Sequence, residues 1–202
     1  MENGIYKLLK KKQNNLGSLH YEIQMFRCMY EYLKRDNFNK GLSNAILESF
    51  LVHVRNLIDF FQGTDNKPPY KHYCDDVIKS DFKDGGGNNL SLVDNWEITR
   101  DDKNKINKRL SHITELRTDM DKDWSKERER FKEEIEKAVK QFLEEISNEY
   151  FPFEKDGIDI KKENFGKYEK DFCDSTKINN GKINHKNLSS EGISNTSSGC
   201  VI

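Results

Sequence analysis

One apolar stretch with helical periodicity, residues 44–61 (NAILESFLVHVRNLIDFF), constrains the fold of this chain most strongly. Its main stripe steps by four and three residues, which is the spacing of one face of an α-helix and not the alternation of a strand. The members of this stripe are Ile46, Phe50, His53, Leu57 and Phe60. The neighbouring face is also apolar, through Leu47, Leu51, Val54, Ile58 and Phe61. A helix that is apolar over so much of its circumference is expected at the centre of a bundle.

Amphipathic repeats predict three further helices, at residues 19–34, 101–120 and 123–149, and all three prolines lie outside them. Ser18 is expected to cap the first of these helices, and Ser43 or Asn44 is expected to cap the central helix. The short link at residues 36–40 favours antiparallel neighbours. The fold class predicted from this pattern is all-α, an antiparallel helical bundle of about four main helices.

The composition changes along the chain and predicts where the packed domain ends. The 202 residues carry a net charge of −1 and a mean hydropathy of −0.93, which is too polar for the whole length to be packed. Residues 154–202 are rich in Lys, Asn, Ser and Gly and poor in large apolar side chains. We therefore expect a helical bundle domain at residues 1–153 and a polar, largely disordered C-terminal tail at residues 154–202.

Several functional classes have no basis in the sequence. No apolar run approaches about 18 residues, so we expect no membrane association. The cysteines are scattered without a paired motif, which predicts reduced thiols in a cytoplasmic protein; they are Cys28, Cys74, Cys173 and Cys200. The His72–Cys74 region has no second cluster to complete a metal site, and the glycine-rich residues 84–89 lack a phosphate-loop signature and are expected to form a linker. We therefore expect neither a metal nor a cofactor.

The candidate functional residues lie on two of the predicted helices. His53 lies in the apolar stripe with Asn56 three residues on, whereas Arg55 projects about 200° away from His53. On the helix at 101–120, Arg109 and His112 are three residues apart and share a face. Lys105 and Lys108 lie alongside, so the basic side of this helix is the best local candidate for a phosphate-binding patch.

The segments ESFLVHVRNLIDFF and INKRLSHITELR, within a small all-α bundle, resemble the HEPN superfamily, in its branch of bacterial defence and abortive-infection proteins. The resemblance covers roughly residues 19–147 and implies a metal-independent ribonuclease that acts as a dimer. The family motif is an arginine, usually followed by a polar residue, and a histidine four to six residues later. Here Arg109 precedes His112 by three positions, and Arg55 or Arg117 would be an alternative source of the arginine.

Two functions remain open from these residues. In a ribonuclease, His112 would be the general acid or base and Arg109 the phosphate clamp, with His53 and Asn56 in supporting roles. In a non-catalytic helical module that binds RNA, a nucleotide or a protein, the histidines would be buried and fully hydrogen-bonded. We expect RNA and a second copy of the chain as partners, and a protein partner is a further alternative.

Overall fold

The computed structural model describes residues 2–35, 38–62, 77–91, 93, 95–111, 124–155 and 157–167. The chain divides into two compact units, Met1–Glu169 and Lys170–Ile202. The second unit lies wholly outside the described residues, and so do the predicted site residues His112 and Arg117. The fold below is that of the first unit.

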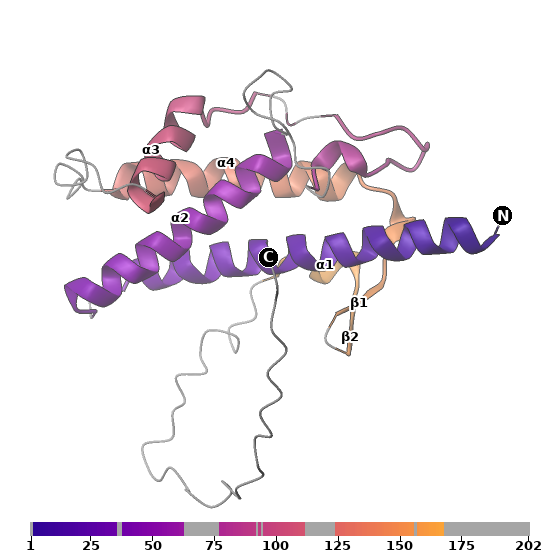
Figure 1. The fold of residues 1–202 in the computed structure, drawn as a ribbon, viewed down its shortest axis with the longest axis horizontal. Coiled ribbons are helices and arrows are strands. Elements are labelled where there is room, and N and C mark those ends of the chain that lie inside the picture. Colours follow the sequence, from indigo (N-terminus) through magenta and orange to yellow (C-terminus); the bar gives the residue numbers. More distant parts are fainter. Residues whose placement is uncertain are drawn as a thin grey trace, which may run out of the picture. The chain divides into compact units, whose positions relative to one another are not determined.

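The described residues form a helical bundle (Figure 1), which confirms the predicted all-α class. Its main elements are α1 (Glu2–Leu33), α2 (Lys40–Gln62), α3 (Arg100–Ser111) and α4 (Ser125–Glu145). Short elements connect and extend them, namely η1 (Lys79–Asp81), η3 (Asn148–Tyr150), β1 (Phe153–Lys155), β2 (Ile158–Ile160) and η4 (Lys162–Asn164). Helix α2 packs against α1, α3 and α4, so the most periodic stretch of the sequence is the central helix.

The helix ends differ from the predicted ones. Helix α1 begins at Glu2, so Ser18 lies inside it and caps nothing. Asn39, and not Ser43 or Asn44, caps α2, because its side-chain Oδ1 accepts a hydrogen bond from the backbone N–H of Leu42 at 2.9 Å. Cap residues also occur within helices, so residue type alone does not locate an end.

Helix α3 begins with a reciprocal cap between two side chains. The backbone N–H of Thr99 donates to Asp102 Oδ2 at 2.8 Å, and the backbone N–H of Asp102 donates to Thr99 Oγ1 at 3.3 Å. This capping box fixes the first turn of a helix that is otherwise strongly polar.

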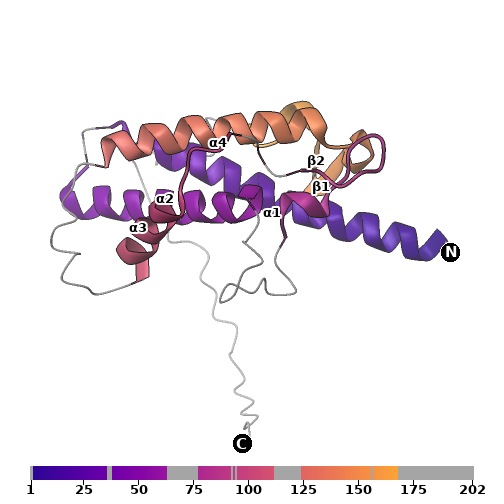
Figure 2. The ribbon, with the colours of Figure 1, turned by 90° about the horizontal axis from the view of Figure 1, so that it is seen from above.

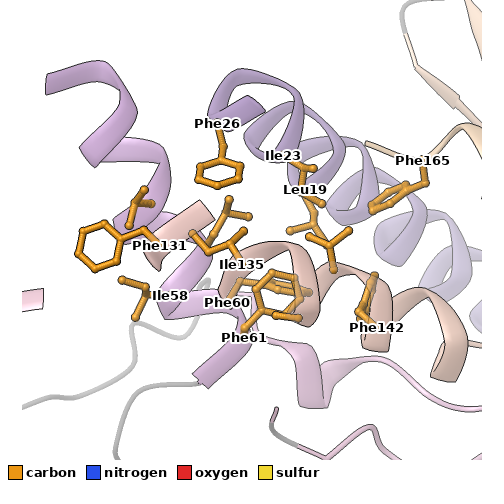
Figure 3. Packing of buried hydrophobic residues seen from close by; sticks show 14 of the residues in the cluster. Leu19, Ile23, Phe26, Ile58, Phe60, Phe61, Phe131, Ile135, Phe142 and Phe165 are labelled. Atoms are coloured by element: carbon orange, nitrogen blue, oxygen red, sulfur yellow. The ribbon is translucent and has the colours of Figure 1, made fainter. Parts of the chain in front are cut away.

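The core is a single aromatic and aliphatic cluster at the meeting of α1, α2 and α4 (Figure 3). The ring of Phe142 on α4 contacts four others within it, those of Phe60, Phe61, Phe82 and Phe165. At a second point, Phe26 of α1 stacks on Phe50 of α2 with ring centroids 5.4 Å apart. Edge-to-face and offset contacts of this kind add to the stabilisation from buried area alone.

The packed unit continues past residue 153, where the composition predicts the domain to end. β1 and β2 form an antiparallel hairpin in which Phe153 pairs with Ile160, and β1 packs on α1. Phe165 is buried, and the backbone N–H of Gly166 donates to Nδ1 of the buried His20 on α1 at 2.9 Å. Overall composition hides these few apolar anchors within a polar segment.

Gly166, which follows η4, allows the chain to approach α1 closely. Its φ is +63°, and a Cβ at this position would lie 2.7 Å from Cγ2 of Ile23. Only glycine combines this backbone conformation with so little space.

The glycine-rich residues 84–89 form a closed turn and not the predicted linker. Asp84 Oδ1 accepts hydrogen bonds from the backbone N–H groups of Gly86 and Asn88, both at 2.8 Å. The turn is joined to the end of α4, because the backbone N–H of Ser147 donates to the carbonyl of Lys83 at 2.9 Å. An aspartate that organises its own turn explains the order of such a glycine-rich segment.

Two further expectations concern redox state and membranes. Cys28 is disulfide-bonded, so the prediction of a reduced thiol is wrong for this residue; its partner lies outside the described residues. Cysteines remote in sequence cannot be paired from spacing alone.

In the part of the chain that the structure describes, none of the helices has both the length and the apolarity needed to cross a membrane.

Three carboxylates of α3 and α4, two buried and one half-buried, are held by cations. Burial alone would raise the pKa of Asp102, but hydrogen bonds from Arg130 and Thr99 outweigh it and lower the pKa below 3.8. Burial would also raise the pKa of Glu136, but the bidentate contact with Arg27, at 2.5 and 2.8 Å, outweighs it. The pKa of Glu136 is therefore lowered below 4.5. Glu134 also has a lowered pKa, because Lys137 outweighs its burial.

Acid is therefore expected to destabilise the fold. Since the folded-state pKa values of these carboxyls are lowered, their stabilisation is complete above their unfolded values and is lost as pH falls through the folded values. The free energy of unfolding, measured with denaturant from about pH 7 to about pH 3, should fall below about pH 5. Asp102→Asn should flatten this dependence; an unchanged profile in the variant would contradict the assignment of Asp102.

Candidate functional site

His53 is the one predicted site histidine within the described residues, and it lies where α2 meets α1. Its exposed fraction is 7%, and its ring Nδ1 is 2.7 Å from Oε2 of Glu22 on α1. A carboxylate can only accept a hydrogen bond, so His53 Nδ1 carries a hydrogen atom and is the donor of the hydrogen bond to Glu22. Among the described residues, no hydrogen bond involves the other ring nitrogen, Nε2.

Glu22 joins His53 and Asn56 into one polar cluster. The side-chain amide of Asn56 donates to the same Oε2 of Glu22 at 3.1 Å. Tyr21 packs edge-to-face with His53, with ring centroids 6.0 Å apart and an interplanar angle of 77°. We call Tyr21, Glu22, His53 and Asn56 the α1–α2 cluster.

Sequence reasoning placed His53 and Asn56 together but missed Glu22. A glutamate on an amphipathic helix is normally a solvated surface residue, so its type and position carry no signal of their own. A histidine predicted to be buried needs a hydrogen-bond partner, and this need was the one indication of Glu22 in the sequence. It indicated that a partner exists but not which helix supplies it.

The α1–α2 cluster has two chemical uses. A carboxylate that holds one ring nitrogen orients the imidazole and leaves the other nitrogen to exchange a proton, as in general acid–base catalysis. The same contacts also tie α1 to α2 and satisfy a buried imidazole. The low exposure of His53 favours the structural role.

Helix α3 is held against both of its neighbours by ion pairs. Lys103 pairs with Asp59 of α2, and Arg130 of α4 makes a bidentate contact with Asp102, at 2.6 and 3.1 Å. Before α3 begins, Gln62 of α2 donates to the carbonyl of Ile98 at 2.9 Å. These contacts fix both the position and the rotation of α3.

The outer side of α3 then carries two cations, Lys105 and Lys108. Both are exposed, and in the described part of the chain neither belongs to an ion pair. They are three residues apart, so they are neighbours on the helix surface. We call this pair the α3 ridge.

The junction of α2 and α3 contains buried polar atoms without partners. Residue 62 meets residue 98, and residue 59 meets residue 103, so the two helices run antiparallel here. One turn further along lie Arg55 on α2 and Asn107 on α3. Their Nε and Oδ1 atoms are buried and have no hydrogen bond within the part of the chain that the structure describes. Buried polar atoms are normally paired, so this donor and this acceptor are unusual.

Arg109, the predicted phosphate clamp, is not on an open surface. Its exposed fraction is 8%, and its Nε is buried without a hydrogen-bond partner. No hydrogen bond or ion pair between described residues links it to His53. Its predicted partner His112 and the alternative Arg117 lie outside the described residues, so the predicted pairing stays a prediction.

A cavity of about 530 Å³ opens between α1, α4 and η4. Val139 and Leu143 supply its apolar part, and its charged lining balances cations such as Lys162 against acids such as Glu163. Mixed charge gives no preference for a polyanion, so the α3 ridge is the better candidate for phosphate.

Metal binding has no basis in the described residues, where no three His, Cys, Asp or Glu side chains gather closely enough to hold an ion.

Comparisons with protein-family models, with curated proteins and with solved structures found no match to this chain.

Proposed function

We propose that this chain is a HEPN-like helical module that binds RNA through the α3 ridge without cleaving it. The observation that carries the proposal is the pair of exposed cations, Lys105 and Lys108, on a helix whose rotation is fixed by ion pairs on two sides. Exposed lysines on a fixed helix, without an ion-pair partner among the described residues, are available to a phosphate backbone.

The charge around the ridge supports a polyanion as ligand. Asp102 and Asp59 are paired with Arg130 and Lys103 respectively, whereas Asp101 is an exposed acid one turn before Lys105. The five cations of α3 nevertheless outnumber its two acids. The net charge of the chain is only −1, so attraction must come from a local patch of this kind.

The junction beside the ridge also supports a ligand with both donors and acceptors. Arg55 Nε needs an acceptor and Asn107 Oδ1 needs a donor. RNA offers phosphate oxygens to the first and hydroxyl or amino groups to the second.

Binding is favoured over cleavage by the burial of two predicted site residues. The predicted phosphate clamp Arg109 is buried, and His53, predicted in a supporting role, is buried and bonded to Glu22. A metal-independent ribonuclease is the second candidate, and the orientation of the His53 ring by Glu22 is the observation in its favour.

The proposal is tested by titrating a labelled RNA with the wild-type protein and with Lys105→Glu/Lys108→Glu. Losing two phosphate contacts should weaken binding roughly tenfold and reduce the log–log dependence of affinity on salt by roughly 1.5. Thermal melts would first show that both proteins are folded.

The matched control is Lys10→Glu/Lys11→Glu. It makes the same change in net charge with exposed lysines of α1. Figures 1 and 2 show this end of α1 far from α3. The control should bind RNA within about twofold of wild type. Equal weakening in both variants would show a non-specific charge effect, and the proposal would fail.

A further inference from the structure

We infer that the RNA bound by this chain is single-stranded and that one of its bases stacks on Tyr21. This inference rests on the proposed function and deepens it. It is based on Tyr21, an exposed aromatic side chain on α1. Helix α1 packs against α2, and α2 packs against α3.

Tyr21 is a large ring on the surface of α1. Its exposed fraction is 41%, although the core of the bundle is strongly aromatic. The edge-to-face contact with His53 holds the ring, and Glu22 in turn holds His53. The ring is therefore both exposed and positioned, which lowers the entropy cost of stacking a base on it.

Between Tyr21 and the α3 ridge the surface runs over α2 and then over α3, because the ridge lies on the outer side of α3. Helix α2 packs against both α1 and α3, and Figures 1 and 2 show it running between them. Neighbouring helix axes are about 8–10 Å apart, so a few nucleotides would span α2. The exposed side chains on this stretch include Val52, which is 40% exposed, and Asn56.

These side chains match the parts of an unpaired strand. Lys105 and Lys108 suit phosphates, Val52 is apolar, and the Asn56 amide can hydrogen-bond a base edge or a hydroxyl. A duplex encloses its bases and cannot offer one to an aromatic ring on a convex helical surface. Stacking on tyrosine therefore selects for single strands.

The experiment compares a short single-stranded RNA with a duplex of the same sequence, using wild type, Tyr21→Ala, Tyr21→Leu and Tyr21→Phe. Removing the ring should weaken single-strand binding roughly tenfold, in both the alanine and the leucine variant. Tyr21→Phe keeps the ring and should bind within about twofold of wild type. Because leucine preserves apolar contact, it serves if alanine disturbs the fold.

Ile158→Ala is the matched control, since it removes an apolar side chain that is 61% exposed on β2. It should bind single strands as wild type does. If wild type binds RNA through the α3 ridge but the tyrosine variants bind equally well, or if duplex binds as tightly as single strand, this inference is overturned alone. If wild type binds neither form, the proposed function fails with it.

Discussion

Replacing Phe142 with alanine is expected to lower the free energy of unfolding by about 3–5 kcal/mol. The Phe142 ring is fully buried and contacts rings from α2 and from the segments that follow η1 and η4. Its removal leaves a cavity at the point where these parts meet, and rigid aromatic neighbours cannot collapse to fill it. Denaturant unfolding followed by circular dichroism measures the loss.

Phe142→Leu is the control, because it keeps most of the buried volume and should cost clearly less than the alanine variant. A loss below about 1 kcal/mol in Phe142→Ala would contradict the placement of this ring in the core.

Replacing Glu145 with alanine is expected to cost about 3 kcal/mol, because it leaves the Lys79 ammonium buried without a counter-charge. The Lys79 side chain is 0% exposed, and its Nζ lies 2.7 Å from Glu145 Oε2. The two atoms meet as an ion pair but not in hydrogen-bonding geometry. Gln141 donates to the other carboxylate oxygen at 2.6 Å and holds Glu145 in place.

Glu144→Ala is the matched control, one residue away on α4. The Glu144 side chain is 67% exposed and lies 3.9 Å from Lys140, so its loss should change the free energy of unfolding by less than about 0.5 kcal/mol. Lys79→Met in the Glu145→Ala background should restore much of the lost stability, since it removes the uncompensated charge. If Glu145→Ala costs no more stability than Glu144→Ala, and if Lys79→Met restores none of it, then Lys79 is not buried as a cation.

The sequence predicted the bundle because burial leaves a periodic pattern. The apolar stripes of α2 and α4 identify both helices and the faces that pack, and the core confirms them. Helix ends were less predictable, because Ser18 has the chemistry of a cap but lies within α1. The docking of Phe165 was also hidden, since a single aromatic anchor makes no pattern.

The candidate site was predictable only in part. His53 and Asn56 share a helix, so their proximity follows from spacing. Glu22 reaches them from α1 through tertiary packing, which no local pattern encodes. The basic side of α3 was visible in the sequence, whereas the burial of Arg109 depends on how α3 is rotated against its neighbours.

RNA binding without cleavage can be measured by capturing RNA on the wild-type protein and determining the length of the RNA that is released. A mixed pool of single-stranded RNA would be incubated with immobilised protein in the presence of EDTA, washed, eluted and analysed by length. We expect the protein to retain RNA and to release it at full length. Absence of retention would contradict the binding claim, and shortened RNA that disappears with His112→Ala would show a ribonuclease instead.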